Sequence, residues 1–361
     1  MNGHRIERLR AQFDQRGVDS FVTTDATHVR YLSGFSGSSG LLLVGKDEAV
    51  LVTDFRYEEQ ASQEAPDVRI EIARDGLIEK LMETQGLIGR RVGFESCWLS
   101  HKSYLTFKEK FTTSEWIPQE GMVESLSIIK DKTEIAKIRE AVRIGDAVFA
   151  KVLRLVRPGI SERDLAAEIE YVARRSGAEK TAFEPIVASG PHSSMPHAPV
   201  TDRRIEEGDL LTVDMGVVYE GYASDLTRTV VIGTPTAKQR RTYEIVLSAQ
   251  NAALDEARAG IACAALDKVA RGIIENAGHG PEFGHSLGHG VGLRVHELPR
   301  LSSKEKRILE PGMVVTIEPG IYIAGWGGVR IEDLVVIREG GCENLTRASK
   351  AFELSDNFDR E

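Results

Sequence analysis

The sequence predicts a two-domain protein, with an α/β domain followed by an α+β domain. The chain has 361 residues, enough for two separate hydrophobic cores. Its first third alternates helical and strand patterns, whereas the rest starts with two long helical patterns and then turns to strands. The pattern changes at residues 127–132. We therefore expect domains at residues 1–126 and 127–361.

The first domain is expected to be α/β. Ile6, Leu9 and Phe13 share one face of a helix that Gly17 would end. Short apolar runs and helical patterns then follow in alternation, with strands at 18–24, 39–44, 48–53, 68–73 and 91–95 and helices from about 55, near 76–85 and near 101–111.

The second domain is expected to be α+β. It begins with helices at 132–156 and 161–176, which Pro158 and Gly159 separate. Ser161 and Asp164 resemble a helix N-cap and its acidic partner. The remaining elements are strands from about 182, helices near 237–258 and 264–276, and two long strands at 313–323 and 328–337.

Composition and charge argue against several classes of protein. The net charge of -9 argues against a nucleic-acid partner, which needs a basic face. Cys97, Cys263 and Cys342 are odd in number and form no CxxC pair, so we expect no disulfide framework and a reducing compartment. No apolar run approaches the roughly 18 residues of a membrane span, and the charged first helix is no signal peptide. A cytoplasmic protein without a membrane partner is expected.

Two aspartates lie in one predicted hairpin. Apolar strands within 210–232 flank a turn around Glu220 and Gly221, which would bring Asp214 and Asp225 roughly opposite each other. Directly opposed side chains have Cβ atoms about 5 Å apart. Two anions so close repel, so either a cation lies between them or both are exposed on the hairpin.

A glycine-rich segment at 284–297 contains His285, His289 and His296. Its four glycines would let the backbone approach a ligand or a metal closely. A lone histidine is more often structural, but three together favour a binding site, because imidazole is a common metal ligand.

Glu318 and Glu332 each lie inside an otherwise apolar strand. A carboxylate there is costly unless it is paired or bound to a metal, or unless the strand lies at an edge with its charges in water. The length of the apolar runs favours pairing or a metal. Arg330 lies two residues before Glu332, hence on the same face of the strand.

These segments together supply four carboxylates and at least one imidazole. Carboxylate-rich sets suit harder divalent ions such as Mn²⁺, and their number fits two ions, which in such enzymes lie about 3.5–4 Å apart. Competing motifs do not hold, since HELPR at 296–300 is not HExxH and GFSGSSG at 34–40 is not the GxSxG elbow. The sequence therefore predicts a two-metal hydrolytic centre.

In order and character, these motifs resemble those of the M24 metallopeptidases of the pita-bread fold, and among them the Xaa-Pro dipeptidases (prolidases) and aminopeptidases P. The segment THVRYLSGFSGSSG at 27–40 is similar to the N-terminal creatinase-like domain of the family. The resemblance covers nearly the whole chain. It implies a creatinase-like α/β domain, a pita-bread catalytic domain, and hydrolysis of the bond between an N-terminal residue and proline in small peptides.

The resemblance also implies a set of metal ligands. Asp214 would bind one ion, and His289 would bind the other. Asp225 and Glu332 would bridge the two ions. Glu318 would bind the second ion and also accept a proton from the attacking water. The two ions would be Mn²⁺, with Co²⁺ or Zn²⁺ as alternatives.

Further residues would hold the peptide. His197, in MPHAP, resembles the family histidine that contacts the substrate and assists the leaving nitrogen. His285 and His296 resemble two histidines that hold the scissile peptide. Tyr322 and Arg330 match positions that adjust the metal ligands.

The resemblance leaves the substrate length open. Arg300 resembles a position that holds the terminal carboxylate of a dipeptide, although an exposed arginine without such a role is nearly as good an interpretation. Both a dipeptidase and an aminopeptidase P therefore stay open. Many relatives have asparagine at the position of His192, which we interpret as a loop residue.

Three alternatives share the fold: a methionine aminopeptidase, a metal-free creatinase, and a non-catalytic binding module. The extra N-terminal domain argues against the first. The other two predict the loss of metal ligands, whereas all five are present in this sequence. Family members usually associate through the N-terminal domain, so we expect a homodimer, which gel filtration would check.

Overall fold

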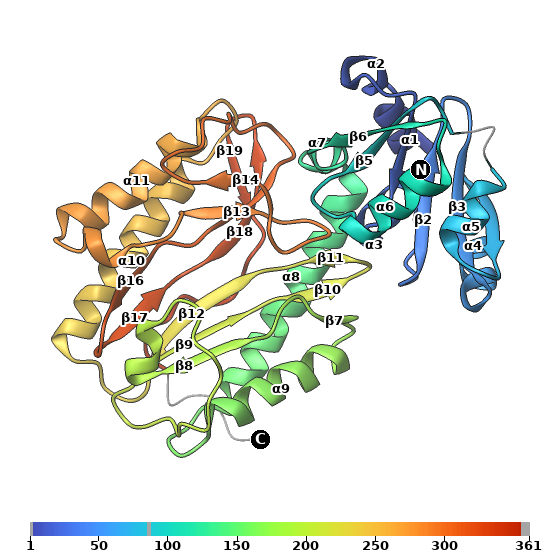
Figure 1. Ribbon diagram of the computed structural model, residues 1–361. Coiled ribbons are helices and arrows are strands. Elements are labelled where there is room, and N and C mark those ends of the chain that lie inside the picture. Colours follow the sequence, from blue (N-terminus) through green and yellow to red (C-terminus); the bar gives the residue numbers. More distant parts are fainter. Residues whose placement is uncertain (1–2, 85–87, 355–361) are drawn as a thin grey trace. The chain divides into compact units, whose positions relative to one another are not determined.

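The computed structural model describes residues 3–84 and 88–354, and the chain forms two compact units, Met1–Ser127 and Ile128–Glu361 (Figure 1). The predicted order of an α/β unit and an α+β unit is confirmed. Within the described residues, no helix has the length and the apolar character that a membrane span requires.

The first unit is built on one six-stranded sheet in the order β4-β3-β2-β1-β5-β6. Its strands are β1 (Ser20–Thr23), β2 (Gly40–Val44), β3 (Ala49–Asp54), β4 (Arg69–Ala73), β5 (Arg91–Glu95) and β6 (Glu115–Gln119). Its helices are α1 (Gly3–Arg10), α2 (Phe13–Arg16), α3 (Ala26–Ser33), η1 (Phe55–Tyr57), α4 (Glu58–Glu64), α5 (Leu77–Met82), α6 (His101–Lys110) and α7 (Glu124–Ser127). The central strand β1 pairs antiparallel with β2 and parallel with β5.

Some elements of this unit differ from the prediction. The helix α3 was not predicted; it begins at the N-cap Asp25 and ends at Gly34, which adopts a left-handed conformation. The strand β6 was also missed, because Pro118 argues against a strand, but β6 lies at the edge of the sheet, where proline is tolerated. The first helix is interrupted after Arg10. Residue 85, at the end of the helix expected near 76–85, lies outside the described residues.

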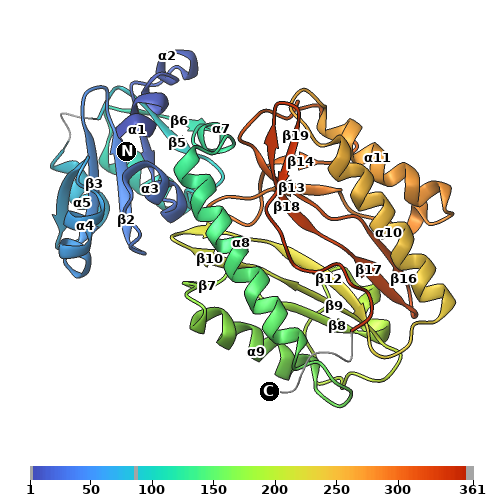
Figure 2. The same cartoon turned by 180° about the vertical axis from the view of Figure 1, so that it is seen from behind.

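The second unit places two pairs of helices against its sheets (Figures 1 and 2). Helices α8 (Lys132–Leu153) and α9 (Glu162–Arg175) share a hydrophobic core with the sheet β12-β9-β8, through residues such as Ile144, Leu165 and Val213. Helices α10 (Ala237–Glu256) and α11 (Cys263–Asn276) share another core with β15 and β18, through Val246, Leu266 and Val335.

In the described part of the second unit, the strands form four sheets, β11-β10-β7, β12-β9-β8, β14-β13-β15-β18-β19 and β16-β17. They are β7 (Lys180–Thr181), β8 (Ile186–Ser189), β9 (Leu210–Met215), β10 (Val217–Tyr219), β11 (Tyr222–Ala223), β12 (Leu226–Val231), β13 (Gly288–Gly290), β14 (Glu297–Leu301), β15 (Val314–Ile317), β16 (Gly320–Ile323), β17 (Gly327–Arg330), β18 (Asp333–Arg338) and β19 (Gly341–Asn344). Short 3-10 turns η3 (Gly190–Ser194) and η4 (Gly280–Glu282) complete the unit.

The prediction of two long, unbroken strands near the C-terminus is wrong. The first is divided into β15 and β16, and the second into β17 and β18, which belong to different sheets. One break falls at Glu318 and Pro319, and proline has no N–H to continue a ladder. The other falls at Ile331 and Glu332. Each glutamate therefore lies where one sheet gives way to the next.

The start of α9 follows the predicted capping pattern. The hydroxyl of Ser161 accepts a hydrogen bond from the backbone N–H of Asp164, and the Asp164 side chain bonds back to the N-cap backbone. The capping box defines the start of the helix, and the first residue after the N-cap, Glu162, is fully buried.

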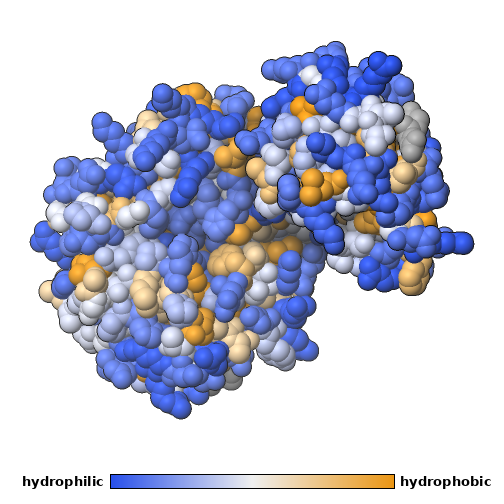
Figure 3. All heavy atoms as spheres, in the orientation of Figure 1, coloured by the Kyte–Doolittle hydropathy of each residue, from blue (hydrophilic) through white to orange (hydrophobic). Residues whose placement is uncertain are grey.

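The surface is mostly hydrophilic on the face drawn in Figure 3, with apolar residues in small patches. Among the described residues, the large apolar side chains with the greatest exposure are Phe55 (74%) and Tyr171 (61%). Isolated apolar residues of this kind are ordinary for a globular surface.

We expect the buried ion pair of His28 and Glu95 to stabilise the first unit in a pH-dependent way. Burial lowers the pKa of His28, but the hydrogen bond and charge of Glu95 outweigh it, and the pKa is raised. The stabilisation is therefore complete below the ordinary histidine pKa of about 6.5 and is lost as the pH rises through the raised value. His28→Gln should cost roughly 1 kcal/mol more at pH 6 than at pH 9.

Urea unfolding followed by tryptophan fluorescence measures this difference, because two of the three tryptophans, Trp98 and Trp116, lie in the first unit. An equal destabilisation at both pH values would contradict the charged pair.

Candidate active site

The structure brings the five predicted metal-ligating side chains together. Asp225, His289 and Glu332 offer ligand atoms that all lie within 4.8 Å of one another. Nε2 of His289 is 3.3 Å from Oε1 of Glu318 and 3.6 Å from Oδ2 of Asp225. Asp214 belongs to the same cluster, because its charge acts on the pKa of Asp225.

The predicted hairpin forms, but its two aspartates are not directly opposed. Asp214, in β9, pairs with Thr227 in β12, and Asp225 lies two residues before Thr227. The two carboxylates are therefore diagonal neighbours, still within reach of a shared partner. They are not exposed on the hairpin, since both are buried.

The site carries an excess of buried negative charge. Burial, and then the neighbouring carboxylates, raise the pKa of Asp225 and of Glu332 well above the ordinary carboxyl value. Burial also raises the pKa of Asp214. At His289 burial lowers the pKa, but the hydrogen bond and charge of Glu318 outweigh it and raise the pKa. All four pKa values are raised, which means that additional positive charge would stabilise the cluster.

The donor set fits divalent cations. In the part of the chain that the structure describes, the buried Oδ1 of Asp214 has no hydrogen-bond partner, while Oδ2 accepts a hydrogen bond from Arg330 at 2.7 Å. A buried carboxylate oxygen without a partner is costly, and a cation would satisfy it. Oxygen ligands with one imidazole suit ions such as Mn²⁺, Co²⁺ or Zn²⁺.

His289 is oriented by the backbone around it. Its Nδ1 lies 3.1 Å from the carbonyl of Gly290, which leaves Nε2 facing the carboxylates. The glycines beside it are needed for strand packing rather than for approach to a ligand. A Cβ on Gly288 would lie 2.1 Å from the Thr316 carbonyl oxygen, and one on Gly290 would lie 2.2 Å from that of Leu298.

Arg330 and Tyr322 connect the carboxylates to His285. Arg330 is buried and donates to Asp214 and, at 2.7 Å, to the hydroxyl of Tyr322. That hydroxyl lies 3.0 Å from Nε2 of His285, whose Nδ1 faces the carbonyl of Ser286 at 2.8 Å. Burial raises the pKa of Tyr322 to about 12, so its proton is available to His285 at neutral pH.

The other predicted substrate residues are exposed and lie near the cluster. His197 and His296 are exposed, and the ring of His296 lies 4.3 Å from that of His289 between centroids. Partial burial, and then the charge of His289, lower the pKa of His296. Arg300 is exposed and pairs with His289 across β13 and β14, so both side chains lie on one face of the sheet.

Sequence reasoning missed two threonines that orient the ligands. Thr227 donates to Oε2 of Glu332 at 2.7 Å, and Thr316 donates to Oε1 of Glu318 at 3.0 Å. Thr227 follows Asp225 by two residues, and Thr316 precedes Glu318 by two. The period of two residues in a strand is the signal that would have found them.

Fold and site together define a metal-dependent hydrolase. Residues 136–339 match the metallopeptidase family M24, and residues 5–129 match the creatinase/prolidase N-terminal domain. The chain belongs to metallopeptidase family M24, and the predicted resemblance and two-domain pita-bread fold are confirmed.

Known proteins match the chain over nearly its full length. It is 42% identical to an Xaa-Pro dipeptidase of Pyrococcus furiosus, over 96% of this chain and 98% of that protein. The structure of an Xaa-Pro dipeptidase from Bacillus anthracis matches with a TM-score of 0.96 and 41% identity, over 98% of this chain and 100% of that one. An X-Pro aminopeptidase of Thermotoga maritima matches with a TM-score of 0.90 and 37% identity, over 95% and 100%.

We expect Glu332→Gln to separate the energetic cost of burying the Glu332 charge from the role of this side chain as a metal ligand. Without metal, the variant removes one repelling anion while Thr227 keeps an oxygen to donate to, so its melting temperature should equal or exceed that of the wild type. Added Mn²⁺ binds only the folded chain and should raise the wild-type melting temperature by several degrees, but that of the variant by much less.

Thermal unfolding with chelator and with Mn²⁺ measures both effects. Glu339→Gln, an exposed glutamate just beyond β18, serves as the matched control. A variant that is less stable without metal, yet gains as much from Mn²⁺ as the wild type, would contradict the assignment of Glu332.

Proposed function

We propose that this protein is a two-metal Xaa-Pro exopeptidase, which hydrolyses the bond between an N-terminal residue and proline in dipeptides, in longer Xaa-Pro-Xaa peptides, or in both. The observation that carries the proposal is the arrangement of one carboxylate cluster beside the largely buried His285 and the exposed His197 and His296. The names of the relatives that match both domains support the preference for proline.

The five clustered side chains would hold the ions. Asp214 would hold one, His289 and Glu318 would hold the other, and Asp225 and Glu332 would contact both. Divalent ions bound there would polarise the peptide carbonyl and lower the pKa of water. Mn²⁺ is the proposed ion, because the ligands are mostly carboxylates.

The chain's own groups are suited to moving protons and holding the peptide. Burial raises the pKa of Glu318, but the hydrogen bond and charge of His289 outweigh it and lower the pKa. Glu318 is therefore ionised and can accept a proton from the attacking water. Burial lowers the pKa of His285, so its imidazole is neutral, and its Nε2 would bind the peptide in exchange for its contact with the hydroxyl of Tyr322. His197, exposed to the substrate, would donate to the leaving nitrogen.

Proline after the scissile bond fits such a site for a physical reason. The imide nitrogen of proline carries no hydrogen, so the site need not provide an acceptor for it. The presence of all five ligand side chains in one cluster supports a metallopeptidase over a metal-free creatinase or a binding module.

A substrate panel tests the proposal. We expect chelator-treated protein to be inactive, and Mn²⁺, Co²⁺ or Zn²⁺ to restore cleavage of an Xaa-Pro dipeptide, an Xaa-Pro-Xaa tripeptide, or both. Cleavage of the dipeptide alone would identify a prolidase, and release of the first residue of the tripeptide would identify an aminopeptidase P. Cleavage of methionyl peptides only, or no metal-dependent cleavage, would contradict the proposal.

Arg300 should decide the preference for dipeptides, if its guanidinium binds their terminal carboxylate. It shares a sheet face with His289 and is exposed, and its Nε lies 3.5 Å from the Ser286 hydroxyl. Arg300→Ala should raise the KM for the dipeptide about tenfold and leave that for a tripeptide amide unchanged. Steady-state kinetics with Lys304→Ala, a nearby exposed cation, as control would check this. An equal effect on both substrates would argue against carboxylate binding.

A further inference from the structure

We propose that Glu162 is a positioning residue for the loop 190–200, and that its buried carboxylate determines where His197 stands in the active site. The kinetic consequence of this inference rests on the proposed peptidase function, whereas its structural consequence does not.

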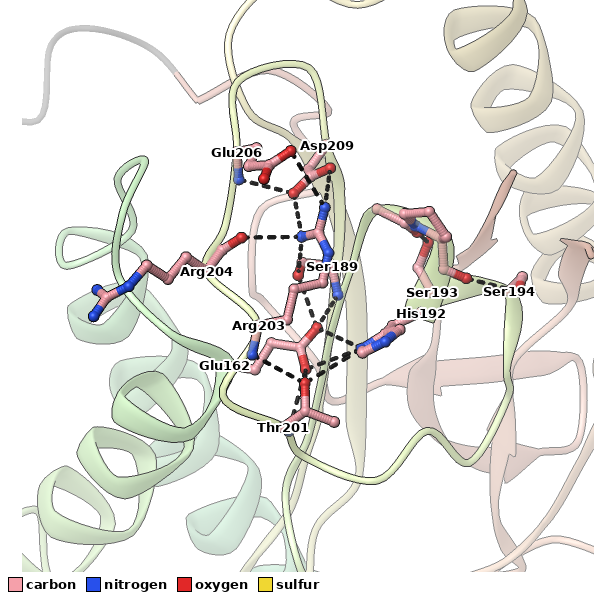
Figure 4. A network of polar contacts seen from close by, with 12 residues as sticks. Glu162, Ser189, His192, Ser193, Ser194, Thr201, Arg203, Arg204, Glu206 and Asp209 are labelled. Atoms are coloured by element: carbon pink, nitrogen blue, oxygen red, sulfur yellow. Dashed lines mark hydrogen bonds and ion pairs between the residues drawn. The ribbon is translucent and has the colours of Figure 1, made fainter. Parts of the chain in front are cut away.

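The carboxylate of Glu162 is fully buried at the first position of α9, yet it is satisfied by hydrogen bonds. Oε1 accepts from the backbone N–H and the hydroxyl of Ser189, at 2.8 and 2.7 Å. Oε2 accepts from the hydroxyl and the backbone N–H of Thr201, at 2.5 and 3.2 Å. Figure 4 shows Glu162 between these two residues. Burial raises the pKa of Glu162, but these bonds outweigh it and lower the pKa, so the group is anionic.

The two partners stand at the two ends of one loop. Ser189 is the last residue of β8 and comes directly before the loop, and Thr201 comes directly after it. Glu162 therefore ties the loop ends together. Nδ1 of His192, inside the loop, lies 3.3 Å from Oε2 of the same carboxylate (Figure 4). A buried anion that accepts several hydrogen bonds fixes its donors firmly, because each donor would lose a charged partner if it moved.

The opposite side of the loop is held by the active site. Arg330 donates to the carbonyl of Pro196, the residue before His197, at 3.2 Å. The backbone N–H of Gly328 donates to the hydroxyl of Ser193 at 2.9 Å. His197 is exposed, and so its position depends on the backbone that carries it. Without the tie at Glu162, the loop would keep these contacts from β17, the pairing of Ser189 with Leu211, and the backbone bond from Arg163 to the Thr201 carbonyl, but its two ends would no longer share one charged acceptor.

A network of charges extends behind the tie. Arg203 donates to the hydroxyl of Ser189 at 2.6 Å and forms an ion pair with Asp209, with contacts of 2.5 and 3.0 Å (Figure 4). The hydroxyl of Ser189 thus accepts from a cation and donates to the Glu162 anion. This arrangement offsets the cost of the buried charge and fixes the end of β8.

The test compares Glu162→Gln with Glu170→Gln, an exposed glutamate on the same helix. The amide nitrogen that the first substitution introduces cannot accept a hydrogen bond. The donors of one loop end, at Ser189 or at Thr201, therefore lose their acceptor and face another donor. We expect faster hydrogen–deuterium exchange across residues 190–201 in the first variant only. We also expect kcat/KM for an Xaa-Pro substrate to fall about 10- to 100-fold with metal content unchanged, as misplacement of a catalytic group does.

Repeating the Glu162→Gln substitution in a His197→Ala protein separates an effect on the position of His197 from a general loss of stability. In His197→Ala protein the positioned group is absent, so Glu162→Gln should change kcat/KM little, while its effect on the melting temperature should persist. Unchanged exchange in residues 190–201, or an equal fall of kcat/KM in both backgrounds, would overturn the inference. If the wild type cleaves no Xaa-Pro peptide, the proposed function fails, and the exchange comparison alone decides this inference. If Glu162→Gln does not fold, Thr201→Val, which removes one donor, takes its place with a smaller change in the same direction.

Discussion

The concentration of buried negative charge in the second unit is the constraint to which its architecture is adapted. Asp214, Asp225, Glu318 and Glu332 converge where strands of different sheets meet, and each would be costly in an unbroken apolar sheet. The backbone beneath them is fixed by Arg228, which is almost fully buried. Its guanidinium donates to the carbonyl oxygens of Thr227 and Glu332 and to the buried carboxylate of Asp333. Rigid support of this kind keeps like charges in place until cations offset them.

The backbone around His197, His285 and His296 is supported on the same principle. In every case a partly or fully buried carboxylate outside the cluster binds the backbone of the histidine's own segment. The pairs are Glu162 with the loop of His197, Asp267 with the segment of His285, and Glu297 with the segment of His296. Two of these carboxylates are themselves held by a cation, Arg271 and Lys130 respectively. The backbone that carries each imidazole is thus fixed by a charge outside the cluster.

The sequence was sufficient for the features that depend on residue type and spacing. Four carboxylates in apolar strands and a histidine between glycines already favoured pairing or a metal over exposure to water, and the structure brings these side chains together. The breaks at Glu318 and Glu332 were missed because an apolar run has the same pattern whether one strand or two strands of different sheets contain it. Glu162 was missed for a related reason, since its partners Ser189 and Thr201 are distant in sequence and an acidic residue at a helix start is ordinary.

Arg330 joins the two parts of the site. Its guanidinium donates to Asp214 in the carboxylate cluster, to the hydroxyl of Tyr322 that faces His285, and to the carbonyl before His197. A lysine has three donors but lacks the planar fork that directs them to fixed places. Because the guanidinium is buried and always charged, it permanently offsets part of the carboxylate charge. The same group therefore links the carboxylate cluster to the segments that carry His285 and His197.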